Sequence, residues 1–171
     1  PQNRIMPLAL DNAAYPRWVY QQRKAAGKPY DLPDWATREE AFWAACELTQ
    51  PDLIFGWDEI GDIQASVDGY KRFRSVYGDR VTPVWQAPAM WDPAKDLRIP
   101  GSQSLKPDER AVIANANWAA KNDPVLRWMC EQSKIVGVGG MVRGPLPPGV
   151  RHLYLAELAR CFPDNHFWAL G

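Results

Sequence analysis

The chain has 171 residues, 46% of them hydrophobic, which is enough for one compact domain with an apolar core. Its 20 basic and 20 acidic residues balance, so the overall charge does not indicate a nucleic-acid partner, although a local basic patch could still attract one. No apolar run approaches the ~20 residues that cross a bilayer, and no signal-peptide pattern opens the chain. We therefore expect a cytoplasmic protein without a membrane partner, and the initial Pro1 indicates a segment of a longer protein.

The three cysteines, Cys46, Cys130 and Cys161, lie far apart and form no C-x-x-C pair. We expect no metal or other cofactor in this segment, and zinc only if its ligands lie outside it. An odd number of separated cysteines also fits a reducing compartment.

Apolar runs alternate with helical patterns along the first half of the chain. The run at residues 5–10 predicts a strand that ends at Asp11. Residues 37–50 predict a helix, which starts with a capping box from Thr37 to Glu40 and ends before Pro51. A strand at 53–57, a helix at 62–77 that ends at Gly78, and a strand at 81–85 follow.

The same alternation continues in the second half. After an irregular stretch at 87–106, the sequence predicts helices at 107–121 and 124–132, a strand at 135–138, a helix at 151–161 and a strand at 166–170. Strands that alternate with helices pair in parallel through right-handed crossovers. Polar or glycine residues follow nearly every strand, which favours an α/β fold of the (β/α)₈ TIM-barrel type over an open sheet. We expect residues 1–171 to form a single catalytic domain, an incomplete barrel of about five strands.

Two carboxylates follow predicted strands and are candidates for chemistry. Asp58 comes directly after an apolar strand, where it could cap the next element or accept paired N–H donors from a guanine-like base. Asp11 is either a turn residue or a second carboxylate at the same mouth. If both face one pocket, unlike environments could separate their pKa values and divide acid and base work between them.

Gln86 ends the strand at 81–85 and carries an amide that suits a base carbonyl or a sugar hydroxyl. The stretch at 137–144 is rich in glycine, which allows a close approach of the backbone to a flat ligand; Gly139, Gly140 and Met141 lie in it. It lacks the spacing of a dinucleotide or phosphate loop, so a tight turn is the simpler alternative. Arg143 could contact a phosphate or lie on a solvated rim. The cluster Lys71-Arg72-Arg74 is typical of a solvated helix face.

These motifs, in this order, resemble those of tRNA-guanine transglycosylases, and most closely the branch that inserts 7-deazaguanine bases into DNA. The segment 10–15 resembles the family's strand-end Asp-Ser-Gly-Gly-aromatic motif, and residues 57–59 resemble its Phe-Asp-Glu. Residues 84–86 are similar to its Val-Gln-Gly segment, residues 136–143 to its Gly-Leu-Gly-Ser-Val-x-Arg stretch, and residues 166–171 to the strand that follows. The resemblance extends over nearly the whole chain.

The resemblance implies a pentosyltransferase that exchanges guanine in DNA, or less expectedly in tRNA, for a 7-deazaguanine such as preQ₀. It gives Asp11 an acid/base role and implies base binding by Asp58, Gln86 and the glycine loop. The target nucleotide would have to leave its stack. The family's nucleophilic aspartate lies on the strand after Gly171, so we expect the isolated segment to be inactive. The chain departs from the family by Asn12-Ala13-Ala14 in place of Ser-Gly-Gly and by Ala87 after the Gln.

Two alternatives stay open from the residues alone. A barrel glycoside hydrolase could use Asp11 and Asp58 as its carboxylate pair, with tryptophans as sugar platforms. A non-catalytic relative could instead bind a base or a nucleic acid. The sequence leaves the choice of deazapurine open, and an oligomer is possible.

Overall fold

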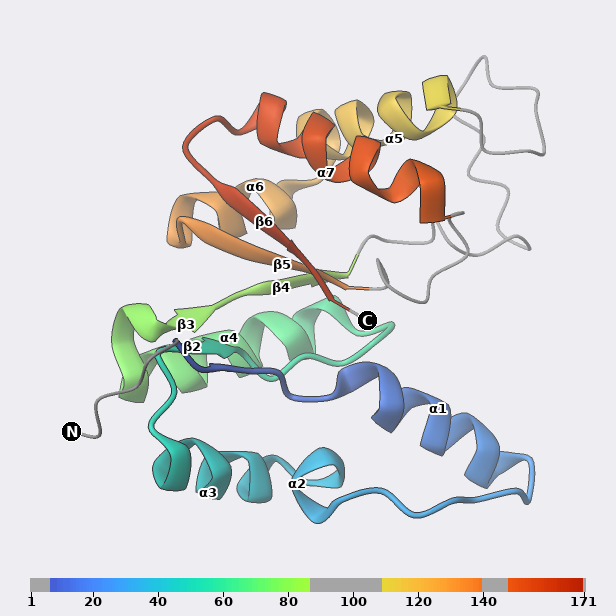
Figure 1. The fold of residues 1–171 in the computed structure, drawn as a ribbon, viewed down its shortest axis with the longest axis vertical. Helices are drawn as coiled ribbons and strands as arrows, with labels where there is room; N and C mark the ends of the chain where they lie inside the picture. Colours follow the sequence, from blue (N-terminus) through green and yellow to red (C-terminus); the bar gives the residue numbers. More distant parts are fainter. Residues whose placement is uncertain (1–6, 87–108, 140–147, 171) are drawn as a thin grey trace. The chain divides into compact units, whose positions relative to one another are not determined.

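The computed structural model describes residues 7–86, 109–139 and 148–170 (Figure 1). The chain divides into two compact units, Pro1–Val84 and Trp85–Gly171. Strands and helices alternate in both, and the strand pairs β1–β2, β2–β3 and β5–β6 are parallel. The α/β class is therefore present, in two small sheets instead of one.

The first unit has a three-stranded sheet in the order β1-β2-β3. Its strands are β1 (Ala9–Leu10), β2 (Leu53–Phe55) and β3 (Val81–Thr82). Leu10 lies opposite Ile54, and Ile54 opposite Val81, so the three strands end at the same edge. The helices are α1 (Ala14–Ala25), α2 (Asp34–Thr37), α3 (Glu39–Thr49), α4 (Ile63–Tyr77) and the 3₁₀ turn η1 (Gly78–Arg80).

Aromatic side chains from α3 and α4 fill the core of this unit. The rings of Trp43 and Phe73 stack with centroids 3.9 Å apart, and Phe42 and Phe73 are fully buried with their centroids 5.2 Å apart. Helix α4 begins at the Asp62 N-cap, whose carboxylate accepts a hydrogen bond from Ala65 N at 2.9 Å. It ends at Gly78, with φ 60°, as the sequence predicts.

The second unit has a sheet in the order β4-β5-β6. Its strands are β4 (Val84–Gln86), β5 (Ile135–Gly139) and β6 (His166–Ala169), and its helices are α5 (Glu109–Asn122), α6 (Pro124–Gln132) and α7 (Pro148–Cys161). Helices α5 and α7 pack side by side (Figure 1). The core includes Trp85, whose ring stacks on Tyr154 and whose indole N–H donates to the Asp123 carboxylate at 3.0 Å. Asp123 also caps α6.

The prediction of an incomplete barrel of about five strands is wrong. The stretch expected to form one strand at 81–85 forms two, β3 and β4, which belong to different sheets and are separated by Pro83. Proline has no backbone N–H, so it interrupts a ladder of hydrogen bonds. The strands therefore do not join into one continuous curved sheet.

The segment between β1 and β2 also differs from the prediction. Helix α1 was not expected, although basic residues in its last turn and Gly27 beyond it are typical helix-end signals. The prediction of a capping box at Thr37 is wrong, because Thr37 ends α2. The residue before α3 is Arg38, whose side chain forms no capping hydrogen bond. Within the described ranges 7–86, 109–139 and 148–170, no helix is long and apolar enough to cross a membrane.

Candidate functional site

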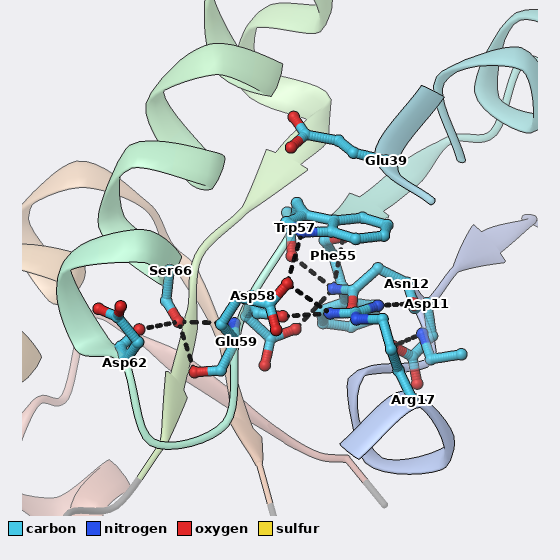
Figure 2. A network of polar contacts seen from close by, with 12 residues as sticks. Asp11, Asn12, Arg17, Glu39, Phe55, Trp57, Asp58, Glu59, Asp62 and Ser66 are labelled. Atoms are coloured by element: carbon cyan, nitrogen blue, oxygen red, sulfur yellow. Dashed lines mark hydrogen bonds and ion pairs between the residues drawn. The ribbon is translucent and has the colours of Figure 1, made fainter. Parts of the chain in front are cut away.

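Polar side chains gather where β1 and β2 end (Figure 2). The parallel register places the residues after Leu10 beside those after Ile54. Asp11 and Asn12 follow β1 directly, and the segment from Trp57 to Glu59 follows β2 after Gly56. The structure therefore brings Asp11 and Asp58 to the same edge of one sheet.

Asn12 connects the two strand ends. It is fully buried, and its Nδ2 donates to Gly56 O at 2.6 Å and to Asp58 Oδ1 at 2.6 Å. Asp58 is only 2% exposed, so this amide compensates part of the cost of burying the carboxylate. In the described part of the chain Asn12 Oδ1 has no hydrogen-bond partner. The Asn12 side chain therefore uses its donors, and not its acceptor, to join the two strand ends.

Arg17 is a second residue that joins the two strand ends, and it is only 3% exposed. Its guanidinium donates to Asn12 O at 2.8 Å and to Asp58 O, and its Nη2 lies 3.6 Å from Glu59 Oε1. The guanidinium carbon is 3.9 Å from the centre of the Trp57 ring. Burial lowers the pKa of Arg17, while the Glu59, Asp58 and Asp11 carboxylates oppose that shift. Together Asn12, Arg17, Trp57, Asp58 and Glu59 form what we name the edge network.

Hydrogen bonds also hold the loop after β2 against helix α4. Trp57 Nε1 donates to Glu59 Oε1 at 3.0 Å, and Glu59 N donates to Ser66 Oγ at 3.0 Å. Ser66 Oγ donates in turn toward Asp62 O at 2.9 Å. Gly69 allows α4 to approach this loop, because a Cβ there would overlap the Trp57 carbonyl. The backbone around Asp58 is therefore fixed on both sides.

Asp11 has a different environment from Asp58. Its side chain is exposed, and its Oδ1 accepts a hydrogen bond from Ala13 N at 3.2 Å. This local turn leads into α1 through Ala13, which has φ 57°. Desolvation by the surrounding protein raises the pKa of Asp11, against the opposing effects of the Ala13 N–H and Arg17. One oxygen of Asp11 thus takes part in the turn after β1, and the residue that caps α4 is Asp62 and not Asp58.

Gln86 and Gly139 meet in the second unit, at the ends of β4 and β5. The end of the Gln86 side chain lies where a Cβ on residue 139 would be, so the side-chain amide packs directly against Gly139. The other members of the predicted loop, Gly140, Met141 and Arg143, lie outside the described residues. Gln86 and Gly139 belong to the second unit, and the edge network belongs to the first.

Sequence reasoning missed Asn12 and Arg17 as members of the site. Asn12 was noted only as a departure from a motif, and Arg17 lies in the unexpected helix α1. An arginine one turn into a helix that starts at a strand end was the available signal, since such a side chain can reach back to the strand carbonyls. Across residues 7–86, 109–139 and 148–170, no group of three or more His, Cys, Asp or Glu side chains could hold a metal ion.

The fold and the site define an α/β protein with a buried network of carboxylate, amide and guanidinium groups at the carboxyl edge of a small parallel sheet. Comparisons with protein-family models, curated proteins and solved structures found no match to the chain.

Proposed function

We propose that this chain is the base-recognition part of a base-exchange transglycosylase, an enzyme that replaces guanine in nucleic acid with a 7-deazaguanine such as preQ₀. DNA is the preferred polymer and tRNA the alternative, following the resemblance of the 136–143 segment to the DNA branch. The observation that supports the proposal is the pair of carboxylates at one sheet edge, Asp11 exposed and Asp58 buried. The proposal rests on this site and its motifs and needs no closed barrel.

In this proposal Asp58 recognises the base. A guanine-type base presents an N1–H and an exocyclic amine side by side, and a carboxylate accepts both. Asn12 holds Asp58 Oδ1 at 2.6 Å, and Arg17 fixes the Asp58 carbonyl, so the carboxylate is positioned before the base arrives.

Asp11 handles protons in the same proposal. When guanine leaves the sugar, its N9 gains electron density and a proton must reach the base; when the 7-deazaguanine enters, its own N–H must be removed. Desolvation raises the pKa of Asp11, and a raised pKa makes the carboxylate a stronger base and the acid easier to retain, which suits both steps. The resemblance places the nucleophile that attacks the sugar C1′ beyond Gly171, so this step is not assigned to a residue of the chain.

The direct test is equilibrium binding of guanine and of preQ₀ to the 171-residue chain by calorimetry. We expect Asp58→Asn to weaken binding at least tenfold, because an amide replaces one acceptor by a donor that faces the base N–H groups. The Asn12 contact to the Oδ1 position can persist in this variant, so the fold should be retained. Asp62→Asn is the matched control: it makes the same change four residues away, at an N-cap where Asn serves as well as Asp.

Either of two results would overturn the proposal. The folded chain could fail to bind both bases, or Asp58→Asn could bind them as well as the parent chain does. The exchange reaction itself is tested on the full-length protein, by offering labelled guanine or preQ₀ together with duplex DNA and tRNA. Label that enters one polymer, and is lost with Asp58→Asn, supports the proposal and names the polymer; no label in either polymer refutes it for these substrates.

A further inference from the structure

The segment between Asp11 and Asp31 has an unusual charge distribution. Residues 12–30 contain four basic side chains and no Asp or Glu, in a chain whose total charges balance. The basic side chains are Arg17, Arg23, Lys24 and Lys28. Arg17 is buried in the edge network, whereas the other three are exposed at the far end of α1.

The end of α1 holds these three cations close together. Gly27, with φ 70°, follows the helix, and its N–H donates to Lys24 O at 3.0 Å. Lys28 N donates to Arg23 O at 2.7 Å, which completes the hydrogen-bond pattern of a Schellman motif. The chain therefore turns back at once, and Lys28 stays next to the last turn of the helix.

These three cations differ from the arginines of other helices in their partners. Arginines on other helices form ion pairs, with Arg72 2.8 Å from Glu39, Arg74 2.8 Å from Asp79 and Arg160 2.7 Å from Glu157. In the part of the chain that the structure describes, the three cations of α1 have no such pair. Arg23 instead lies 5.2 Å from the centre of the Tyr30 ring, and Lys24 lies 6.0 Å from that of Tyr20.

Aromatic rings lie on the same helix, nearer to the edge network. Tyr15 and Trp18 are one turn apart, with ring centroids separated by 6.2 Å, and Trp18 is 37% exposed. At ~1.5 Å per residue, the helix carries the chain about 13 Å from Ala14 to Arg23, a span of a few nucleotides. The order along α1 is thus aromatic rings close to the carboxylates and positive charge further away.

We propose that α1 and its turn form a nucleic-acid-binding surface, made by Tyr15, Trp18, Arg23, Lys24 and Lys28, that holds the strand next to the target nucleotide. Bases stack on the aromatic rings, and the cations contact backbone phosphates. This inference rests on the proposed function, since a base-exchange enzyme must hold the polymer while one nucleotide leaves the stack. The competing explanation is that the cations only stabilise the negative end of the helix dipole. It predicts a loss of thermal stability with unchanged nucleic-acid binding.

The test measures fluorescence anisotropy of labelled DNA, as a 20-nucleotide single strand and as the duplex, and of a tRNA, over a range of salt concentrations. The variant is Arg23→Gln/Lys24→Gln/Lys28→Gln in the 171-residue chain. We expect its affinity at about 0.1 M salt to fall at least tenfold, and the slope of log K against log salt to decrease by about 0.7 to 0.9 per cation lost. The control, Lys121→Gln/Arg127→Gln/Lys134→Gln, makes the same charge change at exposed positions of the second unit and should stay within about twofold.

A second pair of variants tests the aromatic part of the surface. Trp18→Ala should weaken binding about fivefold or more, because one base–aromatic stack is lost, whereas Trp118→Ala, at a tryptophan that is 50% exposed on α5, should not. Thermal unfolding of each variant checks that the fold is intact.

The inference is overturned if the chain binds none of the three polymers, if the triple α1 variant binds them like its control, or if α1-dependent binding occurs only to vesicles of phosphatidylserine and phosphatidylcholine. Its failure is separable from that of the proposed function. Guanine binding by the triple α1 variant should equal that of the parent chain, whereas Asp58→Asn should lose the base and keep the polymer.

Discussion

Replacement of Arg17 tests whether the edge network stabilises the first unit. The guanidinium donates to the Asn12 and Asp58 carbonyls from a position that is 3% exposed. Arg17→Met keeps much of the side-chain volume but leaves both carbonyls without their donor, at about 1 to 3 kcal/mol each. Loss of the contact with the Trp57 ring adds about 0.5 to 2 kcal/mol. The ion pair with Glu59 contributes little, because it is 3.6 Å long and its carboxylate side chain is 35% exposed.

Removal of the buried charge offsets part of this loss, because Arg17 no longer has to be desolvated. We therefore expect a net decrease of about 2 to 4 kcal/mol in the free energy of unfolding, measured by urea titration with tryptophan fluorescence. Arg17→Lys should lose roughly half as much, since an ammonium group keeps the charge but cannot reproduce the planar fork. Arg127→Met, at an exposed position on α6, should change stability by less than about 0.5 kcal/mol. If Arg17→Met also stays within that limit, the reasoning about the network is wrong.

Three further predictions follow from single residues. Because the folded state raises the pKa of Asp11, ionisation of this group costs stability as the pH rises through that pKa. The Asp11→Asn variant should therefore have a higher melting temperature than the parent chain at pH 7, and the same melting temperature near pH 3. Equal melting temperatures at pH 7 would contradict the pKa shift. Gly69→Ala should lower the free energy of unfolding by about 1 to 3 kcal/mol in urea titration, because the new Cβ meets the Trp57 backbone. An unchanged free energy of unfolding would place α4 further from the Trp57 loop. Burial raises the pKa of Cys46 to about 11. At pH 8 the Cys46 thiol should therefore react with a disulfide reagent at least tenfold more slowly in the native chain than in urea. Equal rates would show that the thiol is accessible.

The sequence predicted most elements where a local rule was sufficient. Helix α4 follows from its apolar spacing, its Asp62 cap and Gly78, and α6 begins and ends where Pro124 and the residue pattern indicate. The convergence of Asp11 and Asp58 at one edge also follows, because the carboxyl ends of parallel strands share an edge. The helix ends follow from residues that are close in sequence. The shared edge follows from the parallel pairing that alternating strands and helices predict.

What the sequence did not predict depends on contacts between distant residues. Whether 81–85 forms one strand or two depends on which neighbours pair on each side of Pro83, and the apolar pattern does not contain that information. The capping box at Thr37 satisfied a local rule, but the chain uses Thr37 to end α2 instead. The sequence alone does not distinguish Arg17 from a solvated arginine on a helix. Its partners lie at the ends of β1 and β2, so its role depends on the pairing of these two strands.

The edge network joins parts of the chain that are far apart in sequence, and this has a consequence for folding. Asn12 bonds to Gly56 and Asp58 across 44 and 46 positions, so the carboxylate receives its amide only after a long loop has closed. Contacts of this kind form late, once both strands are in place. A ligand at Asp58 would therefore favour closure of the whole loop, and its presence should slow hydrogen exchange of backbone amides in β1, far from its own point of contact in the sequence.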